Sequence, residues 1–173
     1  MSVSHGESTS SRNPVGDSMA MVVTVSDRSS AGRRPDESGP LLAGLVSGLG
    51  FVVDGPVVVP DDEPAISDAL GRAVARHYDL VVTTGGTGIA PRDVTPEATR
   101  RVIEREVPGL AELIRAKGGE SVATAWLSRG IAGTAGSTLI VNLAGSPGAV
   151  RDGMAVLGPL IGHAVSQLRG GNH

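Results

Sequence analysis

The sequence predicts an α/β fold in which a mostly parallel sheet lies between two layers of helices. Segments with strand-like and helix-like apolar patterns alternate from residue 19 onward, and strands separated by helices form right-handed crossovers between parallel strands. Residues 80–84 read Leu-Val-Val-Thr-Thr without polar alternation, which is typical of a strand buried on both faces of a parallel sheet. Together these observations favour a three-layer α/β/α architecture.

The first half of the predicted domain contains two strand–helix units. Residues 21–25 form an apolar strand, and residues 38–50 follow as a helix for which Ser38 is the expected N-cap. A second strand occupies residues 51–59, and Asp62 is the expected N-cap of the next helix.

The second half continues the same alternation. The strand at residues 80–84 enters a glycine-rich loop. The next helix starts at Thr95-Pro96-Glu97, with Thr95 as the expected cap, proline at the first helical position and an acid in the first turn. The remaining expected elements are two short helices, one strand and one long helix, at residues 108–117, 121–129, 138–143 and 149–168.

Composition sets limits on the function. The 173 residues suit one domain, which we expect to span residues 19–173, and the Ser- and Gly-rich residues 1–18 are expected to be a disordered tail. The absence of cysteine excludes a thiolate metal site and a cysteine nucleophile. A net charge of −3 and three aromatic residues argue against nucleic acid as a partner, and no apolar run approaches the ~20 residues of a membrane span. We therefore expect a soluble, cytoplasmic protein.

Unusual residues collect where the predicted strands end. Ligands of parallel sheets bind outside the carboxyl ends of the strands, so these loops are expected to form one site. The loops are Ser26-Asp27-Arg28, Pro60-Asp61-Asp62, the stretch from Gly85 to Asp93, and Gly145-Ser146-Pro147-Gly148.

The loop Thr84-Gly85-Gly86-Thr87-Gly88 is a candidate phosphate cradle. Glycines let backbone N–H groups approach an anion without obstruction by a Cβ atom. A glycine-rich turn without a ligand is the alternative. The loop is not a Walker P-loop, because no lysine follows, and it is not a dinucleotide fingerprint, because Pro91 stands where the third glycine belongs.

Two aspartates are candidate ligands of a divalent cation. Asp93 lies between the glycine loop and a helix N-terminus, and Asp61 lies at the junction between the second strand and the next helix. If the sheet brings both to one edge, their carboxylates suit Mg²⁺ bound to a triphosphate. Arg92 is suited to a phosphate oxygen. A turn-capping role is the alternative for Asp93, and Asp62 is better explained as a helix cap.

The turn at residues 143–148 superficially matches the nucleophile elbow of α/β-hydrolases, with Ser146 as nucleophile and His163 as base. An oxyanion hole needs the N–H of the residue after the nucleophile. That residue is Pro147, which has no N–H. We therefore reject the hydrolase and interpret the turn as an anion-binding helix start.

Taken together, these loops resemble the molybdopterin adenylyltransferase family of the MogA/MoaB type over nearly all of residues 20–168. The resemblance rests on Val25-Ser26-Asp27-Arg28, on Val59-Pro60-Asp61, on Thr83-Thr84-Gly85-Gly86-Thr87-Gly88 followed by Arg92-Asp93-Val94-Thr95-Pro96-Glu97-Ala98-Thr99, and on Val107-Pro108-Gly109 and Asn142-Leu143-Ala144-Gly145-Ser146-Pro147.

This resemblance implies a Rossmann-like molybdopterin-binding fold, a homotrimer, and Mg²⁺-dependent transfer of AMP from ATP to molybdopterin with release of pyrophosphate. It also implies a molybdenum-insertase partner. The family's two essential aspartates correspond to Asp61 and Asp93, as catalytic residues and metal ligands. The expected substrate-binding residues are Ser26, Asp27, Thr84, Gly85, Gly86, Thr87, Gly88, Arg92, Thr95, Gly145, Ser146 and Pro147.

The chain departs from the family at Ala144, where proline is common. Two other functions stay open. One is a non-catalytic molybdopterin carrier or scaffold of the MoaB type, and the other is a nucleotide-processing enzyme of the same fold that acts on another substrate. The sequence also leaves open whether Asp61 or Asp62 binds the metal.

Overall fold

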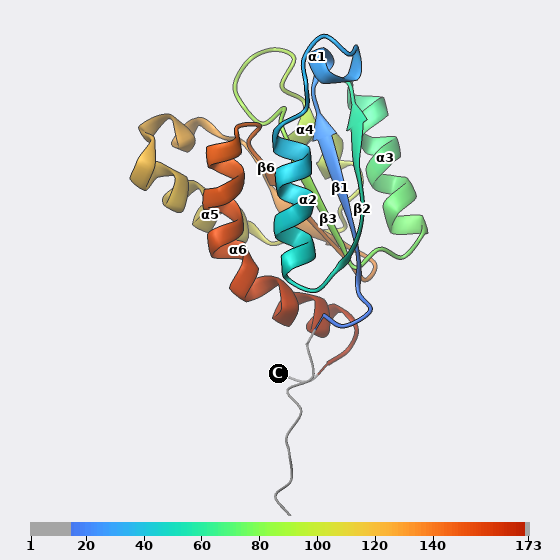
Figure 1. Cartoon of the computed structure of the whole chain (residues 1–173). Coiled ribbons are helices and arrows are strands. Elements are labelled where there is room, and N and C mark those ends of the chain that lie inside the picture. Colours follow the sequence, from blue (N-terminus) through green and yellow to red (C-terminus); the bar gives the residue numbers. More distant parts are fainter. Residues whose placement is uncertain (1–14, 172–173) are drawn as a thin grey trace, which may run out of the picture.

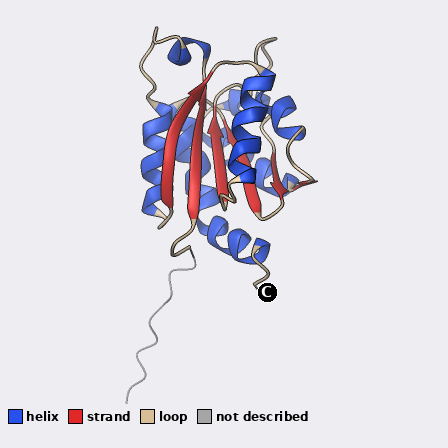
Figure 2. Cartoon of the chain, turned by 90° about the vertical axis from the view of Figure 1, so that its right-hand side faces the viewer, coloured by secondary structure: helices blue, strands red, loops and turns tan. Residues whose placement is uncertain are grey.

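The computed structural model describes residues 15–171, and these form a six-stranded sheet with helices on both faces (Figures 1 and 2). The strand order is β2-β1-β3-β6-β5-β4. The strands are β1 (Met19–Val25), β2 (Val52–Val59), β3 (Leu80–Thr84), β4 (Arg105–Glu106), β5 (Ala132–Ala135) and β6 (Thr138–Leu143). Strands β2, β1, β3 and β6 pair in parallel, whereas β5 and β4 add antiparallel pairs. The expected mostly parallel sheet is confirmed.

The helices pack against the sheet in two layers. They are α1 (Asp27–Ser30), α2 (Ser38–Gly48), α3 (Glu63–Ala75), α4 (Thr95–Arg100), α5 (Pro108–Ser121), the 3₁₀ helix η1 (Ala123–Leu127) and α6 (Pro147–Leu168). Helices α2 and α6 contribute to one apolar cluster, and α3 and α4 contribute to the cluster on the other face. Figure 1 shows α2 and α6 in front of the strands and α3 behind them. The three-layer α/β/α fold is therefore confirmed.

Alternation along the central strands supplies both clusters. Val22 of β1 is fully buried against the α2/α6 layer, and its neighbour Val23 is fully buried against the α3 layer. Helix α3 places Ile66, Leu70 and Ala73 on one buried face because these residues are three or four positions apart. Each fully buried Val, Leu or Ile side chain contributes about 1.5–3 kcal/mol relative to an exposed one.

Two helix starts differ from the expectation. Ser38 is not the cap of α2 but lies buried inside the helix, and Asp36 instead accepts a hydrogen bond from the Gly39 N–H at 2.9 Å. Thr95 is the first residue of α4, not its cap. In both cases the side chain expected to cap is buried. The expected cap of α3 is confirmed, because Asp62 accepts a hydrogen bond from the Ala65 N–H at 3.0 Å.

The region after residue 107 differs most from the prediction. Helix α5 continues past Lys117 to Ser121, and the second expected helix, at residues 121–129, is only the short η1. Gly119 explains the difference, because a Cβ added there would lie 2.3 Å from the Trp126 indole nitrogen. Glycine at this position lets η1 pack directly against α5. Helix α6 begins at Pro147, two residues before the expected start at Ala149.

Strands β4 and β5 were not predicted. They form the antiparallel extension beyond β6 and carry few residues with strand preference. At the other end of the chain, the predicted boundary at residue 19 lies after the buried Val15, which packs in the α2/α6 cluster. The rest of the expected tail, residues 1–14, lies outside the described residues. No helix among the described residues is long and apolar enough to cross a membrane.

Candidate functional site

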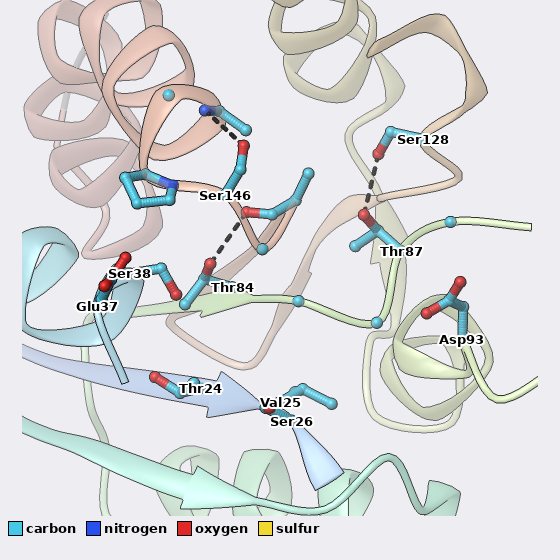
Figure 3. A pocket seen from close by; sticks show the side chains of 18 of the residues that line it. Thr24, Val25, Ser26, Glu37, Ser38, Thr84, Thr87, Asp93, Ser128 and Ser146 are labelled. Atoms are coloured by element: carbon cyan, nitrogen blue, oxygen red, sulfur yellow. Dashed lines mark hydrogen bonds between the residues drawn. The ribbon is translucent and has the colours of Figure 1, made fainter. Parts of the chain in front are cut away.

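A cleft of about 740 Å³ opens at the carboxyl ends of the parallel strands. It is lined by the ends of β1 and β3, the start of α6, and one wall from α5 and η1. Figure 3 shows Thr84, Thr87, Asp93 and Ser146 around it. Eleven of the twelve expected substrate-binding residues and both expected metal ligands line this cleft, as follows: Ser26, Asp27, Asp61, Thr84, Gly85, Gly86, Thr87, Gly88, Arg92, Asp93, Gly145, Ser146 and Pro147.

The twelfth residue, Thr95, holds the glycine loop in place through two hydrogen bonds. Its hydroxyl donates to the Gly85 carbonyl at 2.9 Å, and its N–H donates to the Gly86 carbonyl at 3.1 Å. Thr95 is fully buried, so its role is to hold the loop rather than to contact a ligand.

The first two glycines of the loop are required by its geometry. Gly85 has a φ of +105°, and a Cβ there would lie 2.2 Å from the Val25 carbonyl oxygen. Gly86 has a φ of +66°, and a Cβ there would lie 2.3 Å from the Thr95 hydroxyl. Only glycine combines these left-handed conformations with such close approach. The loop therefore brings bare backbone into the cleft.

The late turn packs on the glycine loop. A Cβ added at Gly145 would lie 3.2 Å from the Gly85 Cα, and the Thr84 hydroxyl donates to the Ala144 carbonyl at 3.0 Å. This hydrogen bond fixes the turn at Ala144. Ser146 then caps α6, because its Oγ accepts a hydrogen bond from the Ala149 N–H at 3.1 Å (Figure 3).

Asp61 and Asp27 form a reciprocal pair, in which the backbone N–H of each residue donates to the carboxylate of the other. The Asp27 N–H donates to Asp61 Oδ2 at 2.9 Å, and the Asp61 N–H donates to Asp27 Oδ1 at 2.8 Å. The ends of β1 and β2 are thereby fixed together. Burial raises the pKa of the Asp61 carboxyl, and the negative charges of Asp27 and Asp93 raise it further. Asp62, by contrast, is exposed and caps α3, so Asp61 is the one of the pair that faces the cleft.

Asp93 lies at the other end of the glycine loop. Its Oδ2 accepts a hydrogen bond from the Ala90 N–H at 3.0 Å, and a Cβ added at Gly88 would lie 2.8 Å from the same oxygen. A Cβ added at Gly86 would lie 3.2 Å from Asp61 Oδ1. The two carboxylates thus flank one loop, close enough for the charge of Asp93 to raise the pKa of Asp61. The exposed Arg92 acts in the opposite direction and lowers this pKa.

The described residues contain no group of three or more His, Asp or Glu side chains that could hold a metal ion without other ligands. A cation held by one or two carboxylates takes its other ligands from water or a bound phosphate. The hydrolase alternative finds no support, because His163 is exposed on α6, roughly 25 Å along the helix axis from Ser146 at 1.5 Å per residue.

Sequence reasoning missed the residues that come from the middle of the chain. Ser128 lines the cleft and donates from its Oγ to the Thr87 Oγ1 at 3.2 Å (Figure 3). Arg115 of α5 also lines the cleft, and its guanidinium donates to the Ser128 carbonyl at 3.2 Å and the Gly130 carbonyl at 2.8 Å. Both residues fall in segments expected to be ordinary helix, and no local pattern marks them.

Comparison with known proteins gives a consistent picture. Residues 21–163 match the family described as a probable molybdopterin binding domain. The molybdopterin adenylyltransferase of Helicobacter pylori is 38% identical over 155 residues, which cover 86% of each chain. A solved molybdopterin biosynthesis protein from Mycobacterium abscessus is 51% identical, with a TM-score of 0.85 over 88% of this chain and 97% of that one.

Some relatives are longer. The molybdenum cofactor biosynthesis bifunctional protein of Synechococcus elongatus is 36% identical over 89% of this chain, and the chain spans 48% of its length. The chain therefore corresponds to about half of that protein, whereas it matches most of the Helicobacter enzyme. The family match extends over the strands and loops that build the cleft, and on this basis the chain belongs to the family of molybdopterin-binding domains.

Proposed function

We propose that the chain is a molybdopterin adenylyltransferase of molybdenum cofactor biosynthesis, which transfers AMP from ATP to molybdopterin. In this reaction a phosphate oxygen of molybdopterin forms a bond to the α-phosphorus of ATP, and the bond from that phosphorus to the bridging oxygen of pyrophosphate breaks. The observation that carries the proposal is the bare glycine loop flanked by Asp61 and Asp93, in a chain of this family.

The residues of the cleft suit this chemistry. A phosphate oxygen is already nucleophilic at neutral pH, so no serine, cysteine or histidine has to be deprotonated. The main tasks are to align two polyanions and to balance charge at the α-phosphorus. The backbone of the glycine loop and the start of α6 suit phosphate binding, and Arg92 at the rim adds positive charge.

The donor set also fits Mg²⁺, which we propose as the metal of the reaction. Asp61 and Asp93 would hold it, and Mg²⁺ would supply neutralisation of phosphate charge. The fit rests on electrostatics: burial and the neighbouring negative charges raise the pKa of the Asp61 carboxyl, and a divalent cation would balance the negative charges. Mg²⁺ in nucleotide enzymes is commonly held by one or two carboxylates together with substrate phosphates and water.

The test is an assay with molybdopterin, Mg²⁺ and ATP labelled at the α-phosphate. We expect label to appear in adenylylated molybdopterin, with one pyrophosphate released per transfer. Binding of molybdopterin without pyrophosphate release would leave the carrier or scaffold as the function. Turnover of ATP that molybdopterin does not stimulate would instead indicate a nucleotide-processing enzyme with another substrate.

The substitution Asp93→Asn replaces the carboxylate with a neutral amide of the same shape. The amide oxygen can still accept the hydrogen bond from the Ala90 N–H, so the loop should keep its shape while the charge is lost. We expect turnover to fall by about 10²- to 10³-fold, the size of effect seen when one electrostatic group is removed from an active site. Molybdopterin affinity, measured by fluorescence titration, should stay close to that of the wild type. Unchanged turnover would remove Asp93 from the mechanism.

The assembly and partners are part of the proposal. The resemblance described above supports a homotrimer, and sedimentation equilibrium would then give three times the chain mass of 17.5 kDa. The bifunctional relatives, in which the matching domain is about half of a longer protein, support a second protein that takes over the product. By the same resemblance that partner is a molybdenum insertase.

A further inference from the structure

The side chain of Arg129 donates hydrogen bonds to the backbone at the end of the glycine loop and in the turn that follows it. Its Nε donates to the Gly88 carbonyl at 2.8 Å, and one terminal nitrogen donates to the Asp93 carbonyl at 2.6 Å. The other terminal nitrogen forms an ion pair with Glu97 of α4. The Arg129 N–H also donates to the Thr87 carbonyl at 2.7 Å. One residue, distant in sequence, therefore contacts four positions of the stretch that carries Asp93.

The two carbonyls that the guanidinium contacts are the ends of one turn. Between them the chain closes on itself, because the Ala90 N–H donates to the Asp93 carboxylate at 3.0 Å and the Asp93 N–H donates to the Ala90 carbonyl at 2.9 Å. Residues 89–92 are exposed and belong to no helix or strand. The turn is closed by these two hydrogen bonds, and Arg129 bridges its entry at Gly88 and its exit at Asp93.

Arg129 is not placed to bind a ligand itself. It lies outside the set of described residues that line the cleft, although its neighbour Ser128 belongs to that set. Each of its three side-chain nitrogens already donates to a protein acceptor. Its charge is balanced by Glu97, whose pKa the guanidinium lowers. The positive charge is therefore directed at the protein rather than at the substrate.

The segment that carries Arg129 is itself fixed to the core. Arg115 of α5 donates to the carbonyls on both sides of Arg129, those of Ser128 and Gly130. The next residue, Ile131, donates its N–H to the buried Asn142 side chain of β6 at 3.2 Å, and Asn142 in turn donates to Thr83 of β3 at 3.0 Å. The turn at residues 88–93 is thus connected to the central strands through Arg129.

We propose that Arg129 is a positioning residue that sets the direction of the Asp93 carboxylate by bridging both ends of its turn. Without the bridge the two ends of the turn separate more easily, the hydrogen bonds between Ala90 and Asp93 open more often, and Asp93 loses its fixed relation to Asp61. A lysine cannot replace the arginine, because a single ammonium group lacks the planar fork that reaches three acceptors in different directions. The catalytic part of this inference rests on the proposed function, and the structural part does not.

The structural part is tested by hydrogen exchange on the unliganded protein. In Arg129→Lys we expect the Ala90 and Asp93 amides to exchange about tenfold faster than in the wild type, the effect of losing a charged hydrogen bond. The matched control is Arg101→Lys, because Arg101 pairs with Glu63 and is exposed at the end of α4, outside the set of described residues that line the cleft. Equal exchange of the two amides in wild type and Arg129→Lys overturns the proposal.

A general loss of stability is a different result and needs its own comparison. If exchange in β3 and β6 also accelerates, the experiment is repeated with Arg129→Ala in the presence and absence of millimolar methylguanidine. Renewed protection of Ala90 and Asp93 by methylguanidine supports the bridge, because the added cation replaces the missing fork. No renewed protection at those amides overturns it.

The catalytic part is tested by steady-state kinetics. We expect Arg129→Lys to lower kcat about tenfold or more while KM for molybdopterin changes little, because the residue fixes a transition-state group rather than a binding contact. Methylguanidine should restore part of the kcat of Arg129→Ala and none of that of Asp93→Asn. If the wild type performs no adenylyl transfer, the proposed function fails and hydrogen exchange still decides the bridge. If the wild type transfers AMP and Arg129→Lys equals it, the inference fails and the proposed function stands.

Discussion

Gly86 decides how closely the glycine loop approaches the carboxylate of Asp61. Its φ of +66° lies in the left-handed region, and a Cβ there would lie 2.3 Å from the Thr95 hydroxyl and 3.2 Å from Asp61 Oδ1. The hydroxyl of Thr95 cannot move away freely, because it donates to the Gly85 carbonyl. A side chain at position 86 would therefore cause both backbone strain and a steric clash with the Thr95 hydroxyl.

We predict that Gly86→Ala loses about 1–3 kcal/mol of unfolding free energy, the cost of a strained backbone conformation, together with most of the transferase activity. Urea unfolding measures the first and the labelled-ATP assay the second. Gly71→Ala is the control, because Gly71 lies within α3 with nothing inside 4 Å of an added Cβ. That variant should gain up to about 1 kcal/mol from better helix propensity. Equal stability of the two variants would contradict the steric argument.

Some residues of the site can be predicted from the sequence, and others cannot. Asp61 and Asp93 could be predicted to share an edge, because the carboxyl ends of parallel strands always meet there. Arg129 could not, because its partners are the carbonyls of Gly88 and Asp93 and one side chain, Glu97. Every residue has a backbone carbonyl, so the sequence does not indicate which carbonyls accept a hydrogen bond from a distant arginine. Such contacts are seen only in the folded chain.

Among the elements, α3 shows most clearly how adjacent acidic residues divide their roles. Asp62 is its N-cap and accepts a hydrogen bond from the Ala65 N–H, whereas Asp61 is fixed to Asp27 and faces the cleft. We predict that Asp62→Ala loses about 1 kcal/mol of unfolding free energy, the usual cost of removing a cap, with turnover close to that of the wild type. Chemical denaturation and the adenylyl-transfer assay measure these two effects. A large loss of turnover at unchanged stability would move the functional role from Asp61 to Asp62.

Elements with a strong apolar period were predictable, and those formed by tertiary contact were not. The strand β3 and the helix α3 follow from their own residues, because their buried positions have the spacing of a strand or a helix. The strand β5 reads Ala-Gly-Thr-Ala, and it forms because β6 offers a free edge. Gly133 shows the same dependence, because a Cβ there would lie 2.6 Å from the Arg105 carbonyl oxygen of β4. Such strands depend on their neighbours more than on their own sequence.

The molecule as a whole has a net charge of −3, yet the proposed substrates are polyanions. The cleft itself carries both positive and negative side chains. Its lining combines the carboxylates around Asp61 with five arginines, namely Arg28, Arg34, Arg92, Arg115 and Arg151. Guanidinium groups suit phosphate oxygens, whereas the carboxylates would repel them. ATP is therefore expected to bind well only when a divalent cation accompanies it.

This requirement leads to a prediction for the stability of the whole chain. A ligand that binds only the folded state raises the unfolding free energy by about 2.7 kcal/mol at a concentration of 100 times its Kd. We expect Mg²⁺ with ATP to raise the thermal midpoint of the wild type, and EDTA to remove most of that increase.

In Asp93→Asn the difference between the two conditions should shrink, because one of the two carboxylates proposed to hold the cation is gone. Asp62→Ala is the control and should keep the full difference, since Asp62 lies outside the set of described residues that line the cleft. An equal increase with ATP in the presence of Mg²⁺ or EDTA would show that the nucleotide binds without a cation, and the pair Asp61 and Asp93 would then need another role.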